Sequence, residues 1–385
     1  MNRSLNPAAA CLAMALAAGA IAAEGPIVQR LAPRGGPETI VCLDSSSPLE
    51  RVHLVFKAGA ESLDAGAAGS LSLLERLVLR GLRGPGDGPS GDFAWEGYAT
   101  AESVGFSVTV PSSSLGAALE SLASVLKSPP LDAGALDEER DAAIERIRAS
   151  ASDPDSVYEA ALSRRLFSKY TWRRDPEGSE KALRAATAES RSRLAAAYLA
   201  PGNAALVVAG GVPADEVLRD EASAFAGWKD GPEARKPAPA HPRPGVARPT
   251  WAVYPDPSMP EGLFSVELRY RGPDAAREPA SSAAADLWAS LIGDPEGRFA
   301  LGALKEIPKP APNAAVGVAH LSQREGGTIS ISALFQADPA SPAAERARAF
   351  KERVRGYELT DMRADPSYCS AGDYAAAKSR LEAAR

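Results

Sequence analysis

The sequence predicts an α+β protein built from two similar domains, and three observations lead to this fold class. With 385 residues, 45% of them apolar, the chain can fill two ordinary cores. Strand patterns and helical patterns occur in both halves in a similar order. Residues 229–249 are rich in Pro, Lys and Arg and show neither period. We therefore expect domains at 24–228 and 250–385, joined by a linker at 229–249.

The first 23 residues have the pattern of a secretory signal peptide. Arg3 precedes an apolar run that ends in small residues, and Ala-Ile-Ala at 20–22 fits a signal-peptidase site. We expect cleavage near Ala22 or Ala23 and a periplasmic or secreted protein. Cys11 leaves a lipoprotein as the weaker alternative, because the apolar run continues past it. No other apolar stretch is long enough to span a membrane.

The elements follow from periodicity: apolar residues at every second position predict strands, and apolar stripes at helical spacing predict helices. In the first half we expect strands at 38–44, 51–59, 103–111 and 203–212, and helices at 66–82, 114–128, 137–150, 156–167 and 187–199. In the second half we expect strands at 251–255, 263–272 and 326–337, and helices at 280–293 and 341–357. The order of two strands, helix, strand and helix in the second half echoes the first half.

Charge and motif content exclude several classes of protein. The net charge is −6 and no basic block occurs, so nucleic acid is excluded as a partner. His53, His241 and His320 lie far apart in sequence, and no Cys-x-x-Cys or phosphate-binding glycine motif is present, so we expect no metal and no cofactor. Removal of the signal leaves Cys42 and Cys369 in opposite halves, and we expect unpaired buried thiols.

The expected helix at 66–82 carries a polar stripe. This helix is apolar almost all round, and its exceptions are Ser72, Glu75 and Arg76. The spacing i, i+3, i+4 places these three side chains on one face. A polar stripe on a buried helix is either a solvated edge or the wall of a cleft, and the residues alone favour a solvated edge.

The stretch from Gly69 to Gly81 resembles the inverted-zincin motif of the insulinase/pitrilysin peptidase family, G-x-x-H-x-x-E-H followed by an apolar turn and Lys/Arg-Gly. Ser72 and Arg76 stand at the two histidine positions, and Glu75 matches the glutamate that serves as general base. The resemblance continues through a strand ending in Val-Pro and a helix of the form E-R-x-x-x-x-E-E. The last glutamate of that helix, the third zinc ligand, is replaced by Arg146. The resemblance covers nearly the whole mature chain.

The resemblance implies an insulinase/mitochondrial-processing-peptidase-like fold. Each of its two homologous domains would be a mostly antiparallel sheet with helices packed on one side. Lys305 stands near the position of the family's substrate-binding arginine, whereas the family's tyrosine there has no counterpart. The sequence ends at Arg385, earlier than a half-enzyme of the family usually does, which indicates a truncated second domain.

The substitutions remove the chemistry of the family's metal site. Serine is a poor zinc ligand, and arginine offers no lone pair and adds a positive charge. We therefore regard Ser72, Glu75, Arg76 and Arg146 as vestigial positions and expect no catalytic residue. We hypothesise that Arg76 and Arg146 occupy the old metal position and pair with Glu75.

The resemblance, with these losses, implies a non-catalytic, exported homologue. Its role would be structural, regulatory or peptide-binding, in a heterodimer with an active sister peptidase. Two alternatives stay open at this point. One is a zinc-dependent peptidase with a displaced site, and the other is an exported peptide-binding protein that acts alone.

Overall fold

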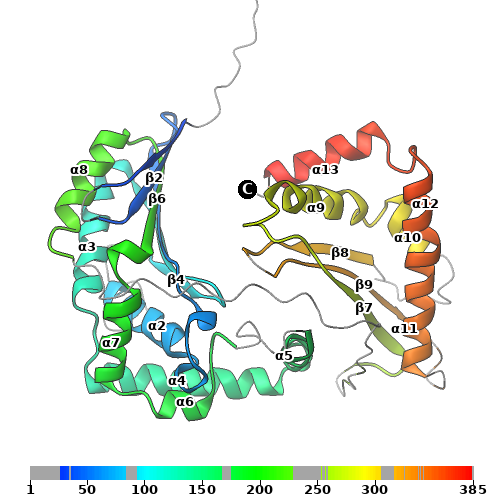
Figure 1. The fold of residues 1–385 in the computed structure, drawn as a ribbon, viewed down its shortest axis with the longest axis horizontal. Coiled ribbons are helices and arrows are strands. Elements are labelled where there is room, and N and C mark those ends of the chain that lie inside the picture. The colour runs from blue at the N-terminus through cyan, green and yellow to red at the C-terminus, as the bar shows by residue number, and fades with distance from the viewer. Residues whose placement is uncertain are drawn as a thin grey trace, which may run out of the picture. The chain divides into compact units, whose positions relative to one another are not determined.

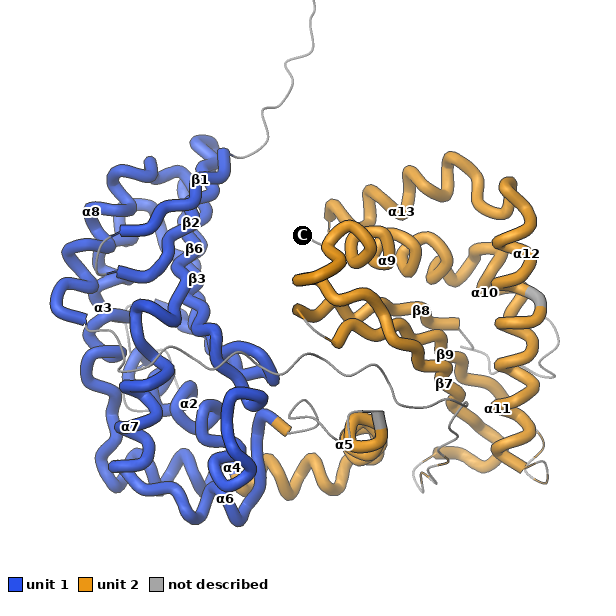
Figure 2. Tube along the Cα trace, in the orientation of Figure 1, with its two compact units in different colours: residues 1–143, 176–236 blue, residues 144–175, 237–385 orange. Residues whose placement is uncertain are grey.

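The computed structural model of the chain describes residues 27–33, 36–83, 93–166, 175–228, 253, 256, 259–304, 316–324, 326–336, 338, 340 and 342–383. The signal segment, the linker, most of the strand expected at 251–255, His241 and Lys305 lie outside the described residues. The chain divides into two compact units (Figure 2). Residues 1–143 and 176–236 form the first unit, and residues 144–175 and 237–385 form the second.

The sheet of the first unit has six strands in the order β1-β2-β6-β3-β5-β4 (Figure 1). Only β2 and β6 are parallel, and every other neighbouring pair is antiparallel, so the expected mostly antiparallel sheet is confirmed. The strands are β1 (Ile27–Leu31), β2 (Glu38–Leu43), β3 (Leu49–Phe56), β4 (Glu96–Ala99), β5 (Val104–Pro111) and β6 (Ala204–Gly210).

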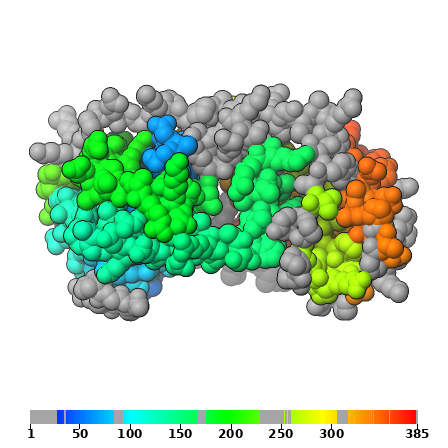
Figure 3. All heavy atoms as spheres, turned by 90° about the horizontal axis from the view of Figure 1, so that it is seen from below, coloured from blue at the N-terminus to red at the C-terminus, as the bar shows by residue number. Residues whose placement is uncertain are grey.

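Helices cover one face of this sheet (Figure 1). They are α2 (Ser70–Arg83), α3 (Leu115–Lys127), α4 (Ala133–Ser152, which continues into the second unit), α6 (Glu180–Arg184), α7 (Ala188–Tyr198) and α8 (Ala214–Ala224). Alternate residues of β3 point at this layer: Val52, Leu54 and Phe56 are fully buried and join α2 and α3 in one core. Seen from below, α4 and α7 lie on the surface of the molecule (Figure 3).

The second unit contains a three-stranded antiparallel sheet in the order β7-β9-β8. Its strands are β7 (Leu263–Arg271), β8 (Val316–Leu321) and β9 (Thr328–Gln336), and its helices are α5 (Pro154–Leu166), α9 (Pro279–Ile292), α10 (Arg298–Leu304), α11 (Ala343–Glu352), α12 (Leu359–Ala364) and α13 (Ala371–Ala383). A π-helical turn, Arg353–Glu358, joins α11 to α12. The core packs the side chains of Val266, Leu268 and Ile331 against helical residues such as Phe350.

The α5 helix reaches the other face of this sheet. Arg269 on β7 points away from the core and donates to both carboxylate oxygens of Glu159 on α5, at 2.7 and 2.9 Å. Cys42 and Cys369 are free thiols, and each is half-buried rather than buried as expected. Among the described residues, no helix combines the length and the apolar character that a membrane crossing requires.

Candidate functional site

Two of the three residues of the stripe predicted on α2 are buried, and the third, Arg76, is half-buried. Leu71, Leu74 and Val78 pack into the core of the first unit, and Leu73 and Leu77 on the remaining sides of the helix are buried as well. Protein therefore covers most of the first two turns of α2, whereas Gly81 and Arg83 in its last turn are exposed. Ser72 is 4% exposed and Glu75 is 5% exposed. The interpretation of the stripe as a solvated edge is wrong for Ser72 and Glu75, whereas the Arg76 side chain keeps 22% of its surface exposed.

The carboxyl group of Glu75 lies against the edge strand β4. A Cβ atom at Gly97 would collide with Oε1 of Glu75, so any other residue at this position would force the Glu75 carboxyl group to move. Burial raises the pKa of Glu75 to about 7, and the positive charge of Arg76 opposes this rise. No other described residue forms a hydrogen bond with the Glu75 side chain. Glu75 is thus a buried carboxyl group, beside an edge strand, with which no described residue forms a hydrogen bond.

Arg76 and Ser72 both bind Glu177. The Nη2 atom of Arg76 donates to the two carboxylate oxygens of Glu177 at 2.6 and 2.7 Å, and Ser72 Oγ donates to Oε1 at 3.1 Å. Our hypothesis that Arg76 pairs with Glu75 is therefore wrong. Consecutive residues of an α-helix point about 100° apart, so the two side chains leave α2 in different directions. Arg146 belongs to the second unit, and its pairing with Glu75 stays a prediction.

Two glycines bring Glu177 to the start of α2. Gly69 and Gly178 both have φ in the left-handed region, +83° and +84°. A Cβ atom on either glycine would collide with the backbone of the other segment. The backbone of residues 177–178 therefore lies directly on residues 68–69, and this contact places the Glu177 side chain beside Ser72 and Arg76.

The polar stripe of α2 continues into its last two turns. Arg80 pairs with Glu138 of α4 at 2.6 Å, and Arg83 donates to the backbone carbonyl of Trp95 at 2.7 Å. Each arginine on this face of α2 is therefore bound by another part of the first unit.

The residues at the former ligand positions do not fit a zinc ion. Zinc needs lone pairs from neutral imidazoles, thiolates or carboxylates, whereas Ser72 offers a hydroxyl group and Arg76 a fixed cation. The Arg76 cation is also bound to a carboxylate of the chain itself. In the part of the chain that the structure describes, no group of three or more His, Cys, Asp or Glu side chains is arranged to hold a metal.

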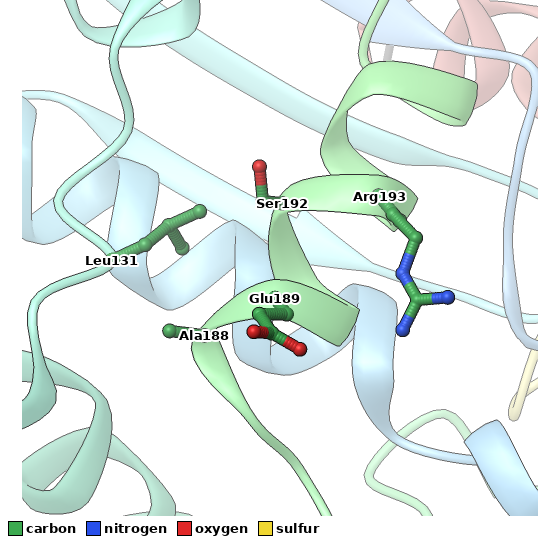
Figure 4. A pocket seen from close by; sticks show the side chains of 5 residues that line it. All are labelled: Leu131, Ala188, Glu189, Ser192 and Arg193. Atoms are coloured by element: carbon green, nitrogen blue, oxygen red, sulfur yellow. The ribbon is translucent and has the colours of Figure 1, made fainter.

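An open hollow lies elsewhere in the first unit, beside the first turns of α7 (Figure 4). It is lined by Leu131, Ala188, Glu189, Ser192 and Arg193. None of the vestigial positions contributes to it. The predicted substrate-binding residue Lys305 lies outside the described residues. The candidate site therefore consists of the polar residues of α2 and the residue Glu177 that binds them.

Neither a protein-family model nor a curated protein matches the sequence. Solved structures do match it over both units. A protease from Helicobacter pylori superposes with a TM-score of 0.70 and 15% identity, over 93% of this chain and 84% of that chain. An inactive peptidase M16 domain from Pseudomonas fluorescens gives a TM-score of 0.68 and 16% identity, over 92% and 83%. Pitrilysin superposes with a TM-score of 0.63 and 16% sequence identity, and the match covers 90% of this chain and 37% of that chain.

The chain has the insulinase-like fold. The resemblance predicted from the α2 motif is confirmed at the level of the fold, because the matching structures include pitrilysin and an M16 domain. The insulinase-like fold places α2 under the sheet with β4 at the sheet edge. Sequence reasoning missed Glu177. The only local signal was the glycine that follows it, in the turn-forming stretch from Asp175 to Ser179.

Proposed function

We propose that the chain is a non-catalytic homologue of the insulinase-like peptidases. The observation that carries this proposal is the position of Arg76, which stands where the family has a zinc-binding histidine and is bound to Glu177. Without an activated metal-bound water, Glu75 has no proton to take from a nucleophile. An inactive M16 domain with the same fold provides a precedent for such a protein.

A peptide-binding role is supported by the edge strand β4. This strand pairs with β5 on one side and ends the strand order of its sheet. The outer edge of such a strand presents backbone N–H and C=O groups to which an extended peptide can add. Gly97 on β4 lies against Glu75, so a bound peptide would pass beside the vestigial site.

We further propose that the protein is exported and acts as the structural, regulatory or peptide-binding subunit of a pair with an active sister peptidase. Export rests on the signal pattern of the first 23 residues. Pairing is supported by the likeness to an inactive M16 domain, because a chain without the catalytic residues of its fold can still hold a peptide for a catalytic partner.

Zinc content tests the proposal. Purified mature protein is exposed to excess zinc, desalted and analysed by inductively coupled plasma mass spectrometry. We expect near zero zinc per chain and no effect of zinc or a chelator on the melting temperature, since the described residues contain no set of metal ligands. About one tightly bound zinc per chain, together with chelator-sensitive peptide cleavage, would overturn the proposal in favour of a displaced catalytic site.

A further inference from the structure

The contact between α2 and Glu177 has the composition of a carboxylate-binding site that the chain fills with its own side chain. A carboxylate only accepts hydrogen bonds, and here it meets donors from Arg76 and Ser72. Arginine and hydroxyl donors are the side chains that recognise carboxylates in general. Ser72 belongs to the first turn of α2, where the helix dipole also favours a negative group.

This cluster reaches solvent, unlike Glu75 beside it. The side chains of Arg76 and Glu177 are 22% and 32% exposed. Water screens a partly exposed ion pair, so breaking it costs less than breaking a fully buried pair. An incoming carboxylate that replaces Glu177 would restore the same bonds to Arg76 and Ser72. The exchange therefore has a small cost.

The backbone at Glu177 is fixed independently of its side chain. The close contact of Gly178 with Gly69 holds the segment on α2 through main-chain packing. Rotation about the side-chain bonds of Glu177 can therefore release Arg76 without moving the turn. Glu177 thus behaves as a tethered competitor for the donors of α2.

We propose that Arg76 and Ser72 form a binding site for the carboxylate of a peptide, and that Glu177 is its internal, displaceable occupant. The ligand carboxylate is either the C-terminus of the peptide or an acidic side chain. This inference rests on the proposed peptide-binding function, to which it adds the chemical group that is recognised. The site requires neither a metal nor a reaction.

Fluorescence anisotropy on the full mature chain tests the site. The probes are four versions of one labelled, unstructured peptide. The first carries an aspartate side chain and a free C-terminus. In the second the aspartate is replaced by asparagine, in the third the C-terminus is amidated, and in the fourth both carboxylates are neutralised. Glu177→Gln should bind the carboxylate peptide roughly tenfold more tightly than the wild type, which corresponds to about 1.4 kcal/mol. Arg76→Met should lose this gain in the double variant. Glu189→Gln, the same change at an exposed site on α7, is the matched control and should leave affinity unchanged.

The single-neutralised probes identify the source of the carboxylate, because only one of them should behave like the fully neutral peptide. Glu177→Asp, which keeps the charge but shortens the reach, is a second and milder variant that should give a smaller gain. Equal affinity for charged and neutral peptides in all variants would overturn the carboxylate site and leave peptide binding intact. No binding of any probe by any variant would overturn the peptide-binding role itself.

Discussion

Glu75 in the first unit and Glu358 in the second are both 5% exposed, yet their surroundings differ. Glu358 accepts hydrogen bonds from Arg353 at 3.0 Å and from the Tyr368 hydroxyl at 2.8 Å. Glu75 has no hydrogen-bond partner in the described part of the chain, and burial raises its pKa to about 7. A buried carboxylate that accepts hydrogen bonds can stabilise the folded state. A buried carboxyl group without hydrogen-bond partners destabilises it, because its desolvation is not offset. Equal burial therefore accompanies a hydrogen-bonded carboxylate in the second unit and a carboxyl group without a described hydrogen-bond partner in the first.

Other buried charged groups differ from one another in the same respect: Glu50 of the first unit is fully buried and accepts hydrogen bonds from the Ser112 hydroxyl and the backbone N–H of Val212 at 2.8 and 2.9 Å. In the second unit, the buried Asp274 pairs with Arg271 at 2.6 Å. In the first unit, Arg191 is 4% exposed, and its hydrogen bonds go to the Ser190 hydroxyl rather than to a carboxylate among the described residues. Burial lowers the pKa of Arg191 to about 10. The comparison yields three predictions of decreasing size.

Glu358→Ala should destabilise the second unit most. The change removes the carboxylate that accepts hydrogen bonds from Arg353 and Tyr368, so these buried donors lose their partner. Deleting one partner of a buried ion pair typically lowers the free energy of unfolding by about 3–5 kcal/mol. Urea unfolding, monitored by hydrogen exchange of the backbone amides in β7 and β9, measures the lost free energy of unfolding. Glu352→Ala, an exposed glutamate on α11, is the control and should change stability little. A loss of stability no larger than that of the control would refute the stabilising role of the Glu358 carboxylate.

Glu75→Gln should alter how stability depends on pH. Because the folded pKa of Glu75 is raised, the folded state holds a proton that the unfolded state loses, so stability falls as pH rises from about 4.5 to about 7 and is level above that. The rise corresponds to about 3 kcal/mol at most. The variant lacks this contribution, so it should lose less stability than the wild type between pH 5 and pH 8. Parallel pH profiles in urea unfolding would contradict the assignment. Burial also raises the pKa of Glu221, but this group titrates in both proteins and cancels in the difference.

Arg191→Leu should stabilise the first unit. Replacing a buried guanidinium group that has no carboxylate partner with an apolar side chain removes a desolvation cost, and gains of about 1–2 kcal/mol are typical of such changes. Thermal unfolding measures the shift in melting temperature. Arg193→Leu on the same helix is exposed and serves as the control, with no expected gain. A lower melting temperature for Arg191→Leu than for this control would show that the guanidinium group is bound productively.

Periodicity predicted most of the elements, because β3, β5 and α3 bury alternate or helically spaced apolar residues in one core. It missed β1, whose residues are exposed on both faces of the sheet and show no alternation. It also missed β4, which has only four residues and contains Gly97. The charged helix α8 and the alanine-rich helix α13 escaped prediction because few of their residues are buried.

The candidate site was predictable in part. The frame of the motif identified Ser72, Glu75 and Arg76, because their chemistry and spacing are local features of one helix. The partner of Arg76 was not predictable, since Glu177 lies 101 residues further along the chain. Its placement depends on a backbone contact between two glycines, which leaves no trace in periodicity or charge. Burial of the stripe was misjudged for a related reason, because the helices that cover α2 come from distant parts of the sequence.

The contact between Gly69 and Gly178 separates the shape of this site from its side-chain chemistry. The close backbone contact holds residue 177 on α2, so we expect the scaffold to tolerate an exchange of the side chain there. A library that varies this single codon would present twenty different groups to the same arginine and serine. Recognition at this site could therefore be engineered by substitutions at residue 177 alone, provided that Gly69 and Gly178 are kept.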